Sequence, residues 1–184
     1  MFNWNPQGDY PKADATSYID PTAVLVGKVE IGKRVLVGPG AVLRADEAGS
    51  LIVIGDDCNV QDRVIVHALR GSAVLVQKGT SLSHGCIVHG PCKIGKNCFI
   101  GFGSVVFNAN LENGVVVKHL AVVENAKITA NRLIPSGFIC KSQNETKILK
   151  EVDKSTKKFC ANVVKVNLGL LRGYMHSSKR SKKK

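Results

Sequence analysis

Aliphatic residues recur every six positions along most of this chain, and this repeat limits the fold more than any other feature of the sequence. Self-similarity at a short fixed period is typical of solenoids, in which each repeat packs on its neighbours. The repeat is accompanied by 18 Gly and only 5% aromatic residues, a mixture that favours thin, regular β-structure. The aliphatic positions are Ile19, Leu25, Ile31, Val37 and Leu43, then Ile54, Val60 and Val66, then Val76, Leu82, Val88, Ile94, Ile100 and Val106, with weaker copies at Leu111, Val117 and Val123.

This register resembles the hexapeptide repeat of left-handed parallel β-helices. In that family three hexapeptides make one triangular coil of about 18 residues, and the aliphatic residue fills the interior. The small or β-branched residue four positions later also points inward, which describes Ala41, Cys86 and Ser104 here. We therefore expect an all-β fold, a left-handed parallel β-helix over residues 1–140, with roughly six coils of repeats between about residues 19 and 128.

The sequence changes character after Pro135. Ser142 and Glu145 have the spacing of a helix capping box, and apolar residues then follow at helical spacing. We expect one or two helices over residues 141–176 that pack along the β-helix. The apolar residues are Ile148, Leu149 and Val152, followed by Phe159, Val163, Val166, Leu170 and Leu171.

The formal net charge of the chain is +12, and basic residues crowd its last six positions. We expect residues 177–184 to be a disordered basic tail, and no nucleic-acid motif or interleaved aromatic residues accompany it. No apolar stretch is long enough to span a membrane, and the first residues lack the features of a signal peptide, so the expected location is cytoplasmic. The basic residues are Lys179, Arg180, Lys182, Lys183 and Lys184.

The six cysteines show no Cys-x-x-Cys spacing, which predicts free thiols. Four of them, Cys58, Cys86, Cys92 and Cys98, occupy the small inward position of the repeat. We interpret these four as compact core residues rather than metal ligands or redox groups.

The six-residue register slips twice, between Leu43 and Ile54 and again between Val66 and Val76. Extra residues in a solenoid emerge as loops, which often lie on the functional face. Three polar residues directly follow the anchor of one face on successive coils, namely Arg44, His67 and His89. Because parallel strands lie about 4.8 Å apart, the imidazoles of His67 and His89 are predicted to reach one metal ion.

His84 falls on a different face, above Asp62 in the same phase of the preceding coil. This second column points away from the first around a single β-helix. A homotrimer with three equivalent interfaces brings the two columns together, with His84 supplied by the neighbouring chain. Arg44 and Asp62 would then form an ion pair across the interface. His119 and His176 lie outside this arrangement and are interpreted as incidental.

These residues resemble those of the gamma-class carbonic anhydrases, in particular the archaeal enzymes and the anhydrase-like domain of carboxysome scaffold proteins. The resemblance covers most of the chain. The matching stretches are Arg44-Ala45-Asp46-Glu47, Asn59-Val60-Gln61-Asp62, Val66-His67-Ala68, His84 through Pro91, Cys98 through Phe102, Val106 through Ala109, Ile134 through Gly137, and Val166-Asn167 through Tyr174.

The resemblance implies a metal-dependent lyase that interconverts CO2 and bicarbonate by a metal-bound hydroxide. His67, His84 and His89 would hold Zn²⁺ or Fe²⁺, with Co²⁺ as a possible substitute. Three neutral imidazoles leave an open position on such an ion and lower the pKa of its water ligand to about 7. Within this resemblance Gln61 orients the hydroxide and Asn167 helps to position CO2 or bicarbonate.

Two further roles follow from the same resemblance. Arg44 and Asp62 match the ion pair between subunits, and Arg44 also assists release of bicarbonate. Glu47 matches an acidic residue near the site and is a candidate for proton transfer.

The chain departs from the archaeal pattern beside the first ligand. His67 is followed by a short, basic Ala-Leu-Arg-Gly-Ser loop. The archaeal type has a longer acidic loop at this place, with a Glu that shuttles protons. In addition, Arg63 stands where the family usually has a Gly. A catalytically weak or inactive scaffold or bicarbonate-binding protein is therefore the alternative. A third class, hexapeptide acyltransferases, would use a lone His as base with coenzyme A, which the set of three correlated histidines disfavours.

Overall fold

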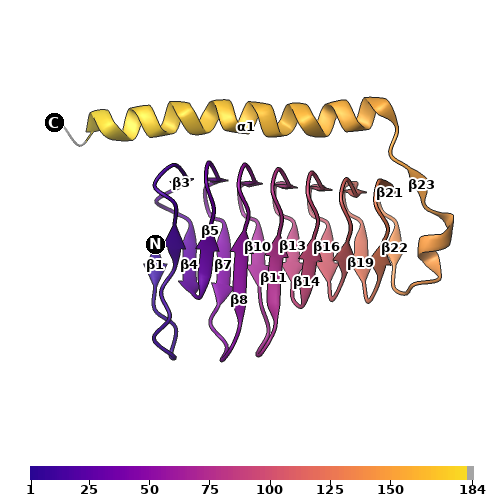
Figure 1. Ribbon diagram of the computed structural model, residues 1–184, viewed down its shortest axis with the longest axis horizontal. Coiled ribbons are helices and arrows are strands. Elements are labelled where there is room, and N and C mark those ends of the chain that lie inside the picture. Colours follow the sequence, from indigo (N-terminus) through magenta and orange to yellow (C-terminus); the bar gives the residue numbers. More distant parts are fainter. Residues whose placement is uncertain (182–184) are drawn as a thin grey trace.

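The computed structural model describes residues 1–181, and side chains through residue 177. Three β-sheets enclose one core, and successive strands are added to the three sheets in turn. Figure 1 shows the strands stacked along the long axis of the molecule. The predicted left-handed parallel β-helix is confirmed, and its about seven turns exceed the roughly six coils expected from the repeats.

Sheet 1 begins at the N-terminus and carries the first of the two predicted columns. Its strands are β1 (Phe2–Asn3), β4 (Val24–Gly27), β7 (Val42–Ala45), β10 (Ile65–His67), β13 (Ile87–His89), β16 (Val105–Phe107), β19 (Val122–Glu124) and β22 (Ile139–Cys140).

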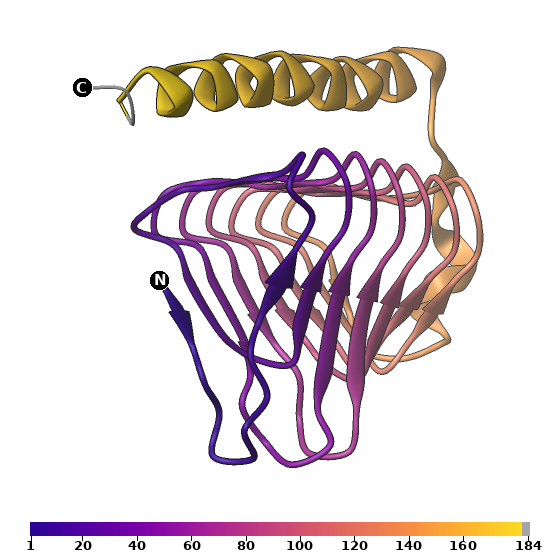
Figure 2. The same cartoon turned by 60° about the vertical axis from the view of Figure 1, so that its left-hand side comes forward.

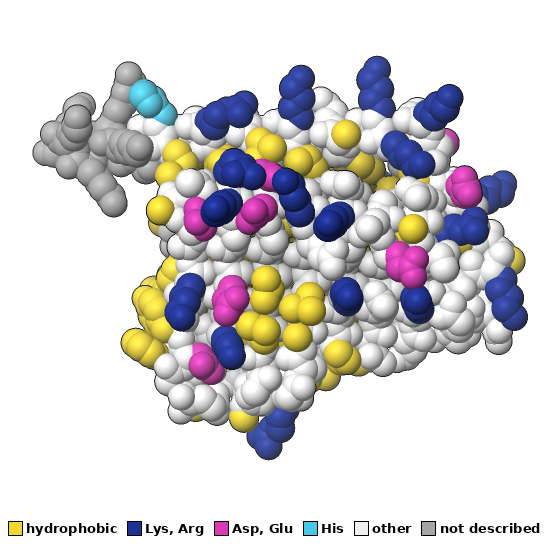
Figure 3. Space-filling view, viewed as in Figure 1, with side chains coloured by type: hydrophobic (Ala, Val, Ile, Leu, Met, Phe, Trp, Pro, Cys, Tyr) yellow, Lys and Arg dark blue, Asp and Glu magenta, His cyan; other side chains and the backbone are white. Residues whose placement is uncertain are grey.

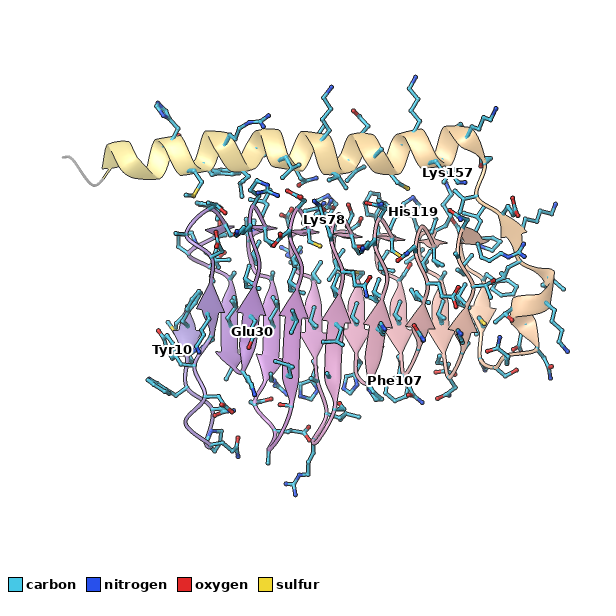
Figure 4. The ribbon with its side chains drawn as sticks, viewed as in Figure 1. Tyr10, Glu30, Lys78, Phe107, His119 and Lys157 are labelled. Atoms are coloured by element: carbon cyan, nitrogen blue, oxygen red, sulfur yellow. The ribbon has the colours of Figure 1, made fainter. Side chains whose placement is uncertain are left out.

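Sheet 2 forms the second side of the triangle. Its strands are β2 (Lys12–Ala13), β5 (Val29–Ile31), β8 (Leu51–Ile54), β11 (Ala73–Val76), β14 (Cys92–Ile94), β17 (Asn110–Leu111) and β20 (Lys127–Ile128). Glu30, labelled in Figure 4, belongs to this sheet, and the same view in Figure 3 shows apolar and charged side chains side by side on its surface.

Sheet 3 forms the third side. Its strands are β3 (Tyr18–Ile19), β6 (Leu36–Val37), β9 (Asn59–Val60), β12 (Ser81–Leu82), β15 (Phe99–Ile100), β18 (Val116–Val117), β21 (Arg132–Ile134) and β23 (Lys150–Glu151). All of these pair in parallel except β23, which pairs antiparallel with β21.

The aliphatic repeat builds the core as predicted. Ile54, Leu82, Ile94 and Ile100 are 0% exposed, and the buried residues form one continuous cluster along the axis. Burying each such side chain stabilises the fold by about 1.5–3 kcal/mol relative to exposure. The six cysteines are all free and buried, so the four at inward positions are core residues as expected. Burial raises the pKa of the Cys86 thiol to about 12.

The two predicted loops are present at the corner between sheets 1 and 2. They span residues 46–50, between β7 and β8, and residues 68–72, between β10 and β11. Figure 2 shows loops that extend below the other coils at this corner. The loops contact each other, because the Gly71 amide donates a hydrogen bond to the Ala48 carbonyl at 3.0 Å.

After β22 the chain leaves the β-helix and passes through a 3-10 helix, η1 (Glu145–Ile148), before β23. The Ser142 hydroxyl donates to the Glu145 carboxylate at 2.6 Å, as the capping pattern predicts. A longer helix does not follow here, because Leu149 and Val152 are buried on either side of β23, which pairs with the edge of sheet 3. Tertiary pairing therefore overrides the helical spacing of this first apolar series.

One long helix, α1 (Lys154–Ser181), then runs back along the whole β-helix, as Figure 1 and Figure 2 show. It packs over β12, β6 and β3 of sheet 3, and Tyr174 stacks on Tyr18 at a ring distance of 4.9 Å. The helix extends beyond the expected end at residue 176, and residues 182–184 of the predicted tail lie outside the described residues. Among residues 1–181, no helix combines the length and apolarity needed to cross a bilayer.

Candidate metal centre

The first predicted column lies on the outer surface of sheet 1. Strands β7, β10 and β13 pair in parallel register, so that Arg44 lies beside His67 and His67 beside His89. The Nδ1 atom of His67 lies 3.0 Å from Nε2 of His89. Since zinc–nitrogen bonds are about 2.0–2.1 Å long, two nitrogens at this separation are within reach of one ion. The stacking predicted from the register is therefore correct.

Charged groups surround His67 on the side of the two loops. Its Nε2 atom lies 3.4 Å from Oδ1 of Asp46, 3.7 Å from Oε1 of Glu47 and 3.4 Å from Nη2 of Arg44. Arg44 in turn lies 3.3 Å from Asp46 through its Nε atom. Asp46 was not predicted as a site residue, although it stands between Arg44 and Glu47 in the stretch that carries the resemblance.

Glu47 also connects the two loops. Its Oε2 atom accepts a hydrogen bond from the Arg70 amide at 2.8 Å, while Oε1 faces His67. The short loop after His67 is thus held by the carboxylate that was predicted to lie near the site. This places Glu47 beside a candidate ligand, and leaves its part in proton transfer a prediction.

The imidazoles of this column suit a metal ion. The Nδ1 atom of His89 is buried and has no hydrogen-bond partner within the described chain. Such an unpaired buried ring nitrogen is costly unless a group from outside the described chain contacts it. Within residues 1–181, one chain does not gather three His, Cys, Asp or Glu side chains into a group that could hold an ion. If His67 and His89 bind a metal ion, one chain supplies two neighbouring ligands from sheet 1, and the set needs a third from elsewhere.

His84 occupies the corner between sheets 3 and 1, after β12. Its Nδ1 atom lies 3.3 Å from Oδ2 of Asp62, and both side chains are 54% exposed. The Gly85 amide donates to the Asp62 carbonyl at 2.9 Å, which stacks these two corners on successive coils. The predicted second column is thus present and open to a partner. Within the chain Asp62 neighbours His84 while Arg44 neighbours Asp46, so the Arg44–Asp62 pair between subunits stays a prediction.

Gln61 is held beside this corner by a buried hydrogen-bond chain. Its Nε2 atom donates to Oδ1 of Asn59 at 2.9 Å, and its Oε1 atom accepts from the His84 amide at 3.3 Å. Asn59 itself donates to Oγ of Ser81 at 2.8 Å. These bonds fix which end of the Gln61 amide faces each neighbour. Asn59 was overlooked as a positioning residue, although an Asn beside the inward anchor of a buried strand is an unusual choice.

Asn167 lies on α1, and its Nδ2 atom donates to the Val163 carbonyl at 2.9 Å. Since α1 covers sheet 3, Asn167 belongs to the same side of the chain as the second column. The structure therefore sorts the predicted site residues into two groups. Arg44, Glu47, His67 and His89 lie on sheet 1 and its loops, whereas Gln61, Asp62, His84 and Asn167 lie on the corner and on the helix over sheet 3.

Comparisons with known proteins identify the family of this chain. A family model described as bacterial transferase hexapeptide (six repeats) matches residues 73–108. Carbonic anhydrase of Methanosarcina thermophila is 36% identical over 196 residues, which cover 95% of this chain and 79% of that protein. Carboxysome assembly protein CcmM of Nostoc sp. is 33% identical over 87% of this chain, which spans only 30% of that longer protein.

Among solved structures, a hexapeptide transferase family protein from Anaplasma phagocytophilum has 26% sequence identity and a TM-score of 0.74, covering 95% of this chain and 98% of its own. That match agrees with the β-helix fold. The sequence similarity over nearly the whole length leads to one conclusion: the chain belongs to the gamma-class carbonic anhydrase family.

Proposed function

We propose that this protein catalyses the reversible hydration of CO2 to bicarbonate at sites shared between the subunits of a homotrimer. The observation that carries the proposal is the placement of His67 with His89 on sheet 1 and of His84 on a different corner. A single chain cannot combine these ligands. In a closed ring of three chains, sheet 1 of each subunit meets the His84 corner of the next, and three equivalent sites result.

The surface of sheet 1 is suited to such an interface. An outward row of aliphatic side chains runs beside the histidine column on successive strands, and Ile65 in this row is 43% exposed. Contiguous exposed apolar rows of this kind commonly mark interaction sites. The row comprises Val42, Ile65, Ile87, Val105 and Val122.

The ligand set of His67, His84 and His89 fits Zn²⁺, with Fe²⁺ or Co²⁺ as alternatives, because borderline divalent ions take neutral imidazoles. When bound by three imidazoles, such an ion lowers the pKa of water to about 7 and so supplies the hydroxide that adds to CO2 at neutral pH. The facing nitrogens of the two stacked rings, Nδ1 of His67 and Nε2 of His89, support this assignment.

Four other residues act on the substrate and its proton. The Gln61 amide, fixed at both ends, orients the attacking oxygen through its remaining donor and acceptor capacity. The Arg44 guanidinium attracts bicarbonate and aids its release, and Asn167 helps to position CO2 or bicarbonate. Glu47, whose Oε1 atom lies 3.7 Å from His67, is the candidate proton acceptor.

The test is stopped-flow CO2 hydration with metal analysis on the same anaerobically purified sample. We expect about one metal ion per subunit and an activity that His89→Ala abolishes together with metal binding. His176→Ala is the matched control, because His176 lies near the end of α1, far along the helix from the site. A fully active His89→Ala protein would exclude this site.

The short loop after His67 favours one second candidate, a scaffold or bicarbonate-binding protein of the same fold with little catalysis. CcmM of Nostoc, which resembles this chain, is by its name a carboxysome assembly protein. A metal-loaded trimer without CO2 hydration at any buffer concentration would decide for this candidate. Activity that rises with buffer concentration would decide for the enzyme.

A further inference from the structure

Both columns of the candidate site continue for two coils beyond the predicted ligands. On sheet 1, His89 pairs in register with Phe107, and Phe107 with Glu124. On the corner, the Gly103 amide donates to the His84 carbonyl at 3.1 Å and the Leu120 amide to the Phe102 carbonyl at 2.9 Å. The corner column therefore runs from Asp62 through His84 and Phe102 to His119, parallel to the column on sheet 1.

The upper corner presents an aromatic surface with one polar group. The ring of Phe102 lies 5.4 Å from that of His84, and the His119 ring stacks on Phe102 at 4.3 Å. Phe102 is 42% exposed. This stack extends the surface that carries His84, and exposed apolar surface of this kind commonly marks an interaction site.

The His119 imidazole has a defined orientation. Its Nδ1 atom accepts a hydrogen bond from the Phe102 amide at 3.1 Å, so in the neutral ring Nε2 carries the proton. Burial, together with the charge of Lys118, lowers the pKa of His119 and favours that neutral form. Within the described chain the Nε2–H group of His119 has no hydrogen-bond acceptor. It lies on the side of the ring away from Nδ1, which accepts from the Phe102 amide.

The upper part of the sheet 1 column offers the complementary groups. The Phe107 ring lies 5.3 Å from that of His89. Glu124 is partly exposed, and its carboxylate has no hydrogen-bond or ion-pair partner among the described side chains. In Figure 4, Phe107 and His119 lie on opposite sides of the β-helix, so the two groups cannot meet within one chain.

The metal site fixes how the two columns align. If His84 joins His67 and His89 of the next subunit, its level lies between those two coils. Coils repeat about every 4.8 Å on both surfaces, so the same offset applies to each following coil. Phe102 then lies between the levels of His89 and Phe107 of the next subunit.

By the same offset, His119 lies between the levels of Phe107 and Glu124 of the next subunit. We propose that Phe102 and His119 of one subunit pack against Phe107 and Glu124 of the next, with the His119 Nε2–H donating to the Glu124 carboxylate. The partner is a second copy of this chain, and the inference rests on the proposed trimer.

This contact has a consequence for the site. A hydrogen bond to a carboxylate is stronger than one between neutral groups, and the two phenyl rings exclude water around it. The contact therefore closes the side of the metal site nearer the C-terminal coils and holds the His84 corner against the other two ligands.

A cysteine pair tests the geometry directly. In His119→Cys/Glu124→Cys, a short bismaleimide should link neighbouring subunits into covalent dimers and trimers on a denaturing gel. The native thiols do not interfere, because all six cysteines are buried and burial raises the pKa of Cys58 and of Cys86 to about 12. His119→Cys/Glu30→Cys is the matched control, since Glu30 is exposed on sheet 2, and it should not link.

Charge reversal gives a second measurement. Glu124→Lys should weaken the trimer about tenfold or more in dilution experiments followed by light scattering, because the lysine faces the donating His119. Glu30→Lys makes the same change in net charge and should leave the trimer unaffected. If the wild-type protein is an active, metal-loaded trimer but neither the cross-link nor the weakening occurs, this contact is wrong and the proposed function stands. If the wild-type protein is monomeric at every concentration, both fail.

Discussion

Two inactive variants, His84→Ala and His89→Ala, can show whether the ligands come from two subunits. Each homotrimer of either variant contains three sites that lack one ligand. A site in a mixed trimer keeps all three imidazoles when its two halves come from the right chains. The His84→Ala chain must supply His67 and His89 on sheet 1, and the His89→Ala chain must supply His84 on the corner. With equal amounts and random assembly, the chance of that order at any interface is one half times one half, so about a quarter of all sites recover.

The assay is co-expression of the two variants with different affinity tags, isolation of trimers that carry both, and stopped-flow CO2 hydration per subunit. Purifying through both tags removes the pure trimers and raises the intact fraction to about one third. The control mixture is His67→Ala with His89→Ala. Both of these ligands belong to the same half, so no mixed trimer regains a complete set. Absence of recovery in trimers that demonstrably contain both chains, or equal recovery in the control mixture, would refute the shared site.

Three further outcomes follow from individual contacts. Asn59→Ala should slow CO2 hydration without loss of metal and reduce the free energy of unfolding by about 1–3 kcal/mol, because the buried Gln61 amide loses its acceptor. Stopped-flow rates with metal analysis measure the first effect, and urea unfolding measures the second. Ile100→Ala, at a position that is 0% exposed, should lower the free energy of unfolding of the metal-free protein by about 2–5 kcal/mol in the same urea assay. Arg34→Ala should lower the urea midpoint at pH 7, and this difference should vanish in acid. The Arg34 guanidinium holds the pKa of the Asp57 carboxyl below its usual value. The ion pair therefore stabilises the fold above the unfolded-state pKa of Asp57, and this stabilisation is lost as the pH falls through the lower pKa of Asp57 in the folded state. An equal midpoint shift at pH 7 and in strong acid would contradict the last of these.

The fold followed from the sequence because a six-residue repeat leaves few choices. Each aliphatic anchor must be buried, and burial of one every six residues on three successive sides closes a triangular coil. The repeat did not reveal the terminal coils, where β1 and β2 precede Ile19 and β22 follows Ile128. The strands β1 and β2 are half-buried or exposed, and depend on pairing with the next coil. The last coil is anchored by Ile134 and Cys140, both 0% exposed, of which Cys140 falls outside the aliphatic pattern. The strand β23 pairs with the edge of sheet 3, and the helical spacing of Leu149 and Val152 concealed it.

The candidate site was predictable to the extent that register determines it. Parallel strands pair residue by residue, so the spacing of His67 and His89 was enough to predict their contact. Asp46 and Asn59 could not be assigned in this way. Asp46 reaches His67 from a loop, and Asn59 acts on Gln61 through a side-chain amide. Both depend on loop conformation and rotamers, on which the period of the repeat has no bearing.

The loop after His67 bears on how a proton could leave the proposed site. In the proposed reaction, each hydration of CO2 releases one proton, and that proton would have to leave a site bounded by two subunits. Glu47 faces His67 with one oxygen, but the Arg70 amide holds the other at 2.8 Å. A carboxylate that is fixed to a backbone amide cannot swing freely between the site and solvent, and the loop itself brings a basic residue rather than a second acid. We therefore expect proton removal to depend on small buffer molecules that reach the site, so that the rate of CO2 hydration should rise with buffer concentration.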